Sequence, residues 1–156
     1  MSGLQVVWFK RDLRTIDHSA LSQASRSGPV LPLFIVEPMF WAQPDASARQ
    51  WQFCAESLAE LRDALAELGQ PLVIRTGDAL AVLKALQRQR GIAQLWSHQE
   101  TGNDFTYRRD RAVAHWCREA GHSLASTPIL WCDPSPRQSR WLGSCLGAVD
   151  APTRLR

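Results

Sequence analysis

The sequence predicts an α/β fold, a doubly wound parallel sheet of about five strands flanked by helices. Short apolar runs rich in β-branched and aromatic residues alternate with longer segments of helical composition. The short runs are apolar on both faces, which is typical of parallel strands that helices cover on both sides. Glycine, proline and helix-capping residues separate the segments. This order favours right-handed βαβ crossovers.

Four segments have the composition of buried strands. The first ends abruptly at a charged stretch, residues 10–14, which we expect to form a loop. Pro32 weakens the prediction of the second strand because proline has no N–H to donate. A fifth strand would have to come from the chain after Gly121. The expected strands are residues 4–9, 30–36, 72–75 and 92–97.

Helical segments follow the strands in turn. We expect Asp17 to cap a helix over residues 18–25, which Gly28 and Pro29 stop. Residues 37–45 are predicted to form a loop with exposed aromatic side chains.

The clearest helix begins at Ser47 and is closed by Gly69 as its C′ residue. Its apolar residues recur at intervals of three and four, so they form a single stripe that should face the sheet. The stripe consists of Trp51, Cys54, Leu58, Leu61, Leu65 and Leu68.

Two further helices complete the alternation. Asp78 is expected to cap a helix over residues 79–89, which Gly91 ends. The last helix is predicted over residues 104–119. The side chains expected to point inward are Leu80, Leu83 and Leu86 in the first of these helices, and Phe105, Val113, Trp116 and Cys117 in the second.

Two loops at the carboxyl ends of strands are the candidate ligand-binding segments, because open α/β sheets bind ligands at that edge. In residues 10–17, Lys10, Arg11 and Arg14 surround Asp12, either as an ion-pair network or as a polar rim for an anionic or heteroaromatic ligand. Residues 98–104 offer carboxylates and amides, which serve either for helix capping or for binding the amide edge of a pterin-like or flavin-like ring.

Composition excludes several classes of protein. The chain has 45% hydrophobic and 21% charged residues with a net charge of +3, an excess too small to indicate nucleic-acid binding. Its four cysteines contain no C-x-x-C pair and its four histidines no metal-binding spacing, so we expect neither a disulfide nor a metal. No apolar run is long enough to span a membrane. The first residues do not resemble a signal peptide, which favours a cytoplasmic location.

Known catalytic motifs are also missing. The loop after the first strand has no glycine-rich phosphate-binding pattern. No nucleophile and base occur at a persuasive spacing, so we expect no catalytic residue in this chain.

Residues 6–18, VVWFKRDLRTIDH, resemble the opening motif of the DNA photolyase and cryptochrome family, V-W-F-[RK]-R-D-L-R followed after two residues by D-[NH]. The segments 33–38, 49–53 and 95–103 also look like the bacterial branch related to plant cryptochromes. The resemblance runs from about Gln5 to Gly121, so we expect residues 1–121 to form the α/β domain of that family.

The resemblance implies a division of labour. The α/β domain would hold an antenna chromophore, a folate or a deazaflavin, that passes excitation to reduced FAD. FAD would lie in a following helical domain, absent here, and would repair a pyrimidine dimer flipped out of DNA. The chromophore-binding residues would be Lys10, Arg11, Asp12, Glu100 and Asp104.

Residues 122–156 differ in character, with four prolines and neither glutamate nor lysine. One interpretation is a disordered tail. The other is a frameshift near Gly121, because the shifted frame can read a pattern like the linker of the family, G-V-V-R-R-L-x-S-R-D-G-W. The gene sequence decides between them.

Three functions stay open at this point. The first is a truncated photolyase or cryptochrome, inactive in repair alone, with DNA as a partner only of the full-length parent. The second is a stand-alone chromophore- or nucleotide-binding module. The third is an adenine-nucleotide enzyme of similar topology, against which the missing glycine loop counts.

Overall fold

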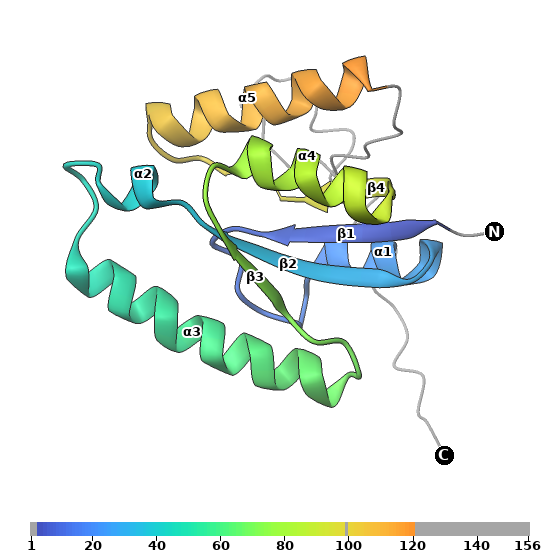
Figure 1. Cartoon of the computed structure of the whole chain (residues 1–156). Coiled ribbons are helices and arrows are strands. Elements are labelled where there is room, and N and C mark those ends of the chain that lie inside the picture. Colours follow the sequence, from blue (N-terminus) through green and yellow to red (C-terminus); the bar gives the residue numbers. More distant parts are fainter. Residues whose placement is uncertain (1–2, 99, 121–156) are drawn as a thin grey trace, which may run out of the picture.

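Four parallel strands form the centre of the protein, in the order β3-β2-β1-β4 (Figure 1). The structure is a computed structural model that describes residues 3–98 and 100–120. The strands are β1 (Leu4–Phe9), β2 (Val30–Val36), β3 (Val73–Thr76) and β4 (Ile92–Ser97). The predicted doubly wound α/β fold is confirmed, with four strands in the described part of the chain rather than about five. The fifth strand expected after Gly121 falls outside it.

Helices cover both faces of the sheet (Figure 1). The first and third helices lie on one face, and the fourth and fifth lie on the other. This arrangement follows from right-handed crossovers between parallel strands. The helices are α1 (Ser19–Ser27), α2 (Pro38–Trp41), α3 (Ala48–Glu67), α4 (Ala79–Arg90) and α5 (Asp104–Glu119). None of the helices in this described part is both long and apolar enough to cross a membrane.

Each face of the sheet has its own hydrophobic core. Alternate residues of β1 point to opposite faces, so Val7 and Phe9 contribute to the core under α1 and α3. Val6 and Trp8 contribute to the core under α4 and α5. Because β1 lies between β2 and β4, all four of these side chains are almost fully buried.

The stripe predicted for α3 is buried only in its centre. Leu58, Leu61 and Leu65 are buried against the sheet, whereas Trp51 is 38% and Leu68 66% exposed. A helix of 20 residues is about 30 Å long and a strand of six residues about 20 Å, so the ends of α3 extend past the sheet. Periodicity finds the inward face of a helix but not how far the sheet reaches beneath it.

The predicted cap of α1 was wrong by one residue. Asp17 has φ 53°, in the left-handed region, and does not start the helix. His18 takes the N-cap position with extended backbone, and its Nδ1 accepts a hydrogen bond of 3.0 Å from the Leu21 N–H. Histidine is an uncommon cap, so a rule based on Ser, Thr, Asp and Asn selects its neighbour.

The prediction of a loop over residues 37–45 is wrong in part, because residues 38–41 form a helix. The short helix α2 begins at Pro38, whose fixed φ suits the first position of a helix. It ends at Trp41, after only four residues. So short a helix has no apolar period that a sequence could display.

We expect Ser47→Ala to lower the free energy of unfolding by about 1 kcal/mol. Ser47 and Gln50 form a capping box: Ser47 Oγ accepts from the Gln50 N–H (3.2 Å) and Gln50 Oε1 accepts from the Ser47 N–H (2.8 Å). Urea unfolding would measure the loss, with Glu60→Ala, at an exposed residue in the middle of the same helix, as control. Equal stability of Ser47→Ala and wild type would contradict a stabilising cap.

Candidate functional site

A cavity of about 1030 Å³ opens at the carboxyl edge of the sheet. The chain leaves β1 at Lys10, β2 at Glu37 and β4 at His98, and the strand order places these three exits side by side. Lys10 and Glu37 line the cavity, as does Glu100 just beyond β4. Its aromatic lining includes Phe40, Trp41 and Phe53 from α2 and the first half of α3, and Trp8, Phe9 and Phe34 from β1 and β2.

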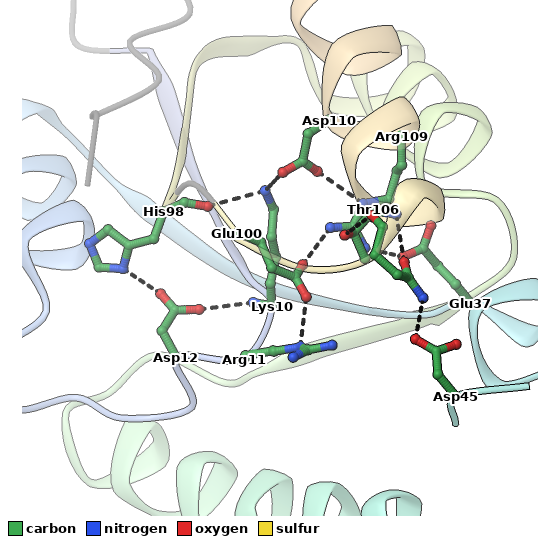
Figure 2. A network of polar contacts seen from close by, with 11 residues as sticks. Lys10, Arg11, Asp12, Glu37, Asp45, His98, Glu100, Thr106, Arg109 and Asp110 are labelled. Carbon is green, nitrogen blue, oxygen red and sulfur yellow. Dashed lines mark hydrogen bonds and ion pairs between the residues drawn. The ribbon is translucent and has the colours of Figure 1, made fainter. Parts of the chain in front are cut away.

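Arg109 of α5 is the centre of a buried charge network at this edge (Figure 2). Its guanidinium contacts three carboxylates: Nη1 lies 2.6 Å from Glu37 Oε2, Nη2 2.6 Å from Glu100 Oε2 and Nε 3.0 Å from Asp110 Oδ1. Burial alone would lower the pKa of Arg109, but the three carboxylates raise it above its usual value. The guanidinium therefore stays charged and holds β2, the loop after β4 and α5 together.

Two further cations complete the network. Lys10 Nζ lies 2.7 Å from Asp110 Oδ2 and donates to the His98 carbonyl (3.1 Å). Burial lowers the pKa of Lys10 although Asp110 opposes that shift. Arg11 Nε lies 2.7 Å from Glu100 Oε1. Three cations thus face three carboxylates, so the network is close to neutral.

Asp12 is held by two histidines. Its Oδ2 lies 2.5 Å from His18 Nε2 and 2.6 Å from His98 Nδ1, and its Oδ1 accepts from the Lys10 N–H (3.0 Å). The His18 contact is close, but its geometry falls short of a regular hydrogen bond. Burial raises the pKa of Asp12, but the contacts with His18, the Lys10 N–H and His98 outweigh burial and leave that pKa well below its usual value. Asp12 is therefore an ionised anchor of the loop after β1.

The cluster of Asp12, His18 and His98 brings together three groups that ligate metals, all within 4.8 Å of one another. The ring of His18 argues against that use. Its Nδ1 accepts from the Leu21 N–H, so the proton of the neutral ring is on Nε2, the nitrogen that faces Asp12. A metal would need the lone pair of that nitrogen. The cluster fits hydrogen bonding to a carboxylate better than metal binding.

The structure brings together four of the five residues predicted from the sequence. Lys10, Arg11, Asp12 and Glu100 all line the cavity. Asp104 does not: it lies in the first turn of α5, mostly exposed, and pairs with Arg108 at 2.7 Å. The capping of α5 belongs to Asn103, whose Oδ1 accepts from the Thr106 N–H.

Sequence reasoning missed Arg109, Glu37 and the role of His98. Arg109 is four residues from both Phe105 and Val113, so it lies on the apolar side of its helix. A charged residue on an apolar face is a sign of a buried ion pair, and that sign was available. Glu37 follows a buried strand immediately, which places it at the ligand-binding edge. No local signal in the sequence predicts that Asp12 contacts His98, which is 86 residues away.

Gly102 lets the loop after β4 close against α5. A Cβ at this position would lie 2.3 Å from Thr106 Oγ1, which is too close for any side chain. The loop that carries Glu100 into the cavity therefore requires glycine here.

Comparison with known proteins agrees with the fold and with the sequence motif. Residues 5–129 match the family model of DNA photolyase. A deoxyribodipyrimidine photo-lyase of Agrobacterium fabrum is 39% identical over 138 residues, which is 86% of this chain and 28% of that protein. The chain thus spans little more than a quarter of the length of this relative.

Two solved structures have a similar fold. A bacterial class III photolyase from Agrobacterium tumefaciens superposes with a TM-score of 0.72 at 27% identity, over 82% of this chain and 26% of that one. An archaeal photolyase from Sulfolobus tokodaii superposes with a TM-score of 0.69 at 28% identity, over 78% of this chain and 28% of that one. That structure contains two FAD molecules and is described as implying a novel light-harvesting cofactor. From its opening motif, its sheet and the match over residues 5–129, the chain belongs to the DNA photolyase family.

Proposed function

We propose that this domain binds a light-harvesting chromophore, a folate or a deazaflavin, for a photolyase or cryptochrome. The observation that carries the proposal is the cavity of about 1030 Å³ at the carboxyl edge of the sheet, with aromatic walls and a charged floor. Sites for small ligands and cofactors have volumes of roughly 300–1,000 Å³ and combine apolar walls with a few polar groups.

The polar groups of the cavity suit the edge of a pterin or flavin ring. Arg11 contacts Glu100 through its Nε, and within residues 3–98 and 100–120 its two terminal nitrogens have no further partner, so they can donate to a ring carbonyl. Asp45 Oδ2 accepts from Asn103 (2.8 Å), and among the described residues its other oxygen has no partner, so that oxygen can accept from a ring N–H. Both residues line the cavity. A donor and an acceptor at one rim match a lactam edge, which offers a carbonyl beside an N–H.

Each part of the site has a separate task in this proposal. When bound, the chromophore would absorb light and pass the excitation to FAD elsewhere in the full-length protein. Phe40, Trp41 and Phe53 pack against its ring and exclude water. The network around Arg109 fixes the positions of Arg11 and Glu100, so the rim is ordered before a ligand arrives.

We expect the purified chain to bind folates, flavins or deazaflavins, with changes in ligand absorbance and fluorescence. Phe53→Ala should weaken this binding about tenfold, because ring stacking contributes roughly 1 kcal/mol beyond buried area. Phe53 is 72% exposed, so the substitution should leave the fold intact. Ile16→Ala, at an exposed residue outside the cavity lining, is the matched control.

A different outcome would favour another function. If none of these ligands binds while ATP raises the melting temperature, the adenine-nucleotide interpretation replaces this one. The absence of a glycine-rich loop after β1 makes ATP binding the weaker expectation.

Repair of DNA is a further proposal, for the full-length parent and not for this chain. The resemblance assigns FAD and the flipped pyrimidine dimer to a helical domain that follows the α/β domain. We therefore propose that the 156-residue chain does not repair dimers in light, with or without added FAD. Separately, we propose the cytoplasm as its compartment. Light-dependent loss of dimers from irradiated DNA with this chain alone would contradict the proposal.

Of the two interpretations of residues 122–156, we propose the frameshift near Gly121. These residues lie outside the described part of the structure. Resequencing the gene from about codon 110 tests it. A shifted frame that continues into a helical domain supports the frameshift, whereas a gene that keeps the present frame refutes it.

A further inference from the structure

Exposed charges of opposite sign form stripes on the helices that cover the two faces of the sheet. Exposed acidic residues of α3 recur at intervals of three and four, so they share the side opposite its buried leucines. Exposed basic residues of α5 recur at the same intervals, on the side opposite the buried Val113 and Cys117. The acidic stripe consists of Glu56, Glu60, Asp63 and Glu67, and the basic stripe of Arg108, Arg111, His115 and Arg118.

The helix α4 extends the basic stripe into a basic face, the outer side of α4 and α5. The two helices lie next to each other over the same core (Figure 1), and α4 contains no acidic residue. The exposed acids at this face are Asp78, which caps α4, and Asp104 and Glu119, which pair within α5. Among the described residues, the exposed cations of this face with no carboxylate within 4.0 Å are Lys84, Arg88, Arg90, Arg111 and Arg118.

We propose that the basic face of α4 and α5 binds the phosphate backbone of double-stranded DNA. Arginine and lysine side chains that neutralise phosphates release condensed counterions, which supplies most of the affinity of sequence-independent binding. The net charge of +3 does not reveal this face, because the acids of α3 offset the cations of α4 and α5 in the total. The inference does not depend on a chromophore. It gives the α/β domain a DNA contact of its own, separate from the dimer site proposed for the helical domain.

A duplex fits this face better than a single strand. Proteins that bind single strands without sequence preference stack the bases on aromatic side chains. On α4 and α5, within the described part of the chain, Tyr107 is the only exposed aromatic residue, and the Arg111 guanidinium already lies 5.7 Å from its ring centroid. Contacts to phosphates need no unstacked base. The 16 residues of α5 extend over about 24 Å, which at 3.4 Å per step is about seven base pairs.

A second copy of the chain is the weaker candidate for this face. The acidic stripe of α3 has nearly the same length as the basic stripe of α5, so the two could meet between molecules. Exposed ion pairs contribute little each, whereas association costs both proteins their independent motion. DNA adds the release of counterions to the same kind of ion pair, so the observations favour DNA.

Fluorescence anisotropy of a labelled duplex of about 20 base pairs tests the inference on the purified 156-residue chain. We expect binding in dilute salt that weakens steeply as the salt concentration rises. Two duplexes of unrelated sequence should bind equally well, because phosphate contacts carry no sequence information. A single strand of the same length should bind more weakly.

Two double variants remove charge from the basic face, K84Q/R88Q in α4 and R111Q/R118Q in α5. Each should lower the slope of log affinity against log salt by about two, one for each phosphate contact removed. R26Q/R62Q is the matched control, since it removes the same charge from exposed residues of α1 and α3. Its slope should equal that of the wild type.

Four outcomes would overturn the inference. They are no binding of the duplex in dilute salt, tighter binding of the single strand than of the duplex, and slopes in both face variants equal to that of the wild type. The fourth is self-association in sedimentation that K84Q/R88Q abolishes, without duplex binding, which would assign the face to a second copy. None of them bears on chromophore binding, because the four substituted residues of the face lie outside the cavity lining.

Discussion

Arg109→Leu should lower the free energy of unfolding by about 3–5 kcal/mol. The guanidinium contacts Glu37, Glu100 and Asp110, and its side chain is 9% exposed. Removing it leaves carboxylates in a region that water barely reaches, with only Lys10 and Arg11 to compensate them. Burial already raises the pKa of Glu37 against the pull of Arg109, and loss of Arg109 would raise it further. The loss is a large share of the stability of a typical domain.

A neighbouring arginine provides the control for this prediction. Arg108→Leu removes an ion pair with Asp104 in which both side chains are more than two-thirds exposed. Exposed pairs of this kind contribute less than about 1 kcal/mol. Urea unfolding of both variants measures the difference in their free energies of unfolding. Arg109→Lys keeps the charge but not the contact with all three carboxylates, so its loss of stability should fall between those of the two leucine variants. Similar losses for Arg108→Leu and Arg109→Leu would mean that the buried network does not hold this edge together.

The fold could be predicted from sequence because its signals are local. Each strand is a short apolar run, and each long helix has a capping residue and an apolar period, as at Asp78 and Ser47. The failures come from tertiary context. Asp17 has the right side chain for a cap but a left-handed backbone, and the ends of the α3 stripe extend beyond the sheet.

The candidate site could be predicted in part, for a similar reason. Lys10, Arg11 and Asp12 follow β1 directly and Glu100 follows β4 closely, so the rule for carboxyl ends of parallel strands selects them. Asp104 satisfies the same rule but sits on the outer side of α5, since the rule does not include the direction of a helical side chain. Pairings such as Asp12 with His98 join loops 86 residues apart. Only the three-dimensional arrangement of the strands brings those loops together.

Asp12→Asn should destabilise the protein by about 2 kcal/mol near pH 7, and the effect should disappear in acid. Its carboxylate has contacts with His18, His98 and the Lys10 N–H, and hydrogen bonds to charged groups contribute about 1.5–3 kcal/mol. The pKa of Asp12 in the folded protein lies below its value in the unfolded chain, about 3.9. Its contribution is therefore fully present above about pH 5 and is lost as the pH falls below about 4, towards the lower pKa of the folded state.

Urea unfolding of wild type and Asp12→Asn between pH 7 and pH 2.5 measures this contribution. The difference between the two proteins should narrow as the pH falls below about 4, because protonation removes from the wild type the charge that the variant lacks. Asp63→Asn is the control, since Asp63 is 72% exposed and pairs with the similarly accessible Arg62, so its effect should be small at every pH. A difference for Asp12→Asn that does not change with pH would show that Asp12 acts through the shape of its loop rather than through its charge. In the expected case, the histidines hold the loop after β1 only while Asp12 is ionised, and the cavity rim that begins at Lys10 depends on the same charge.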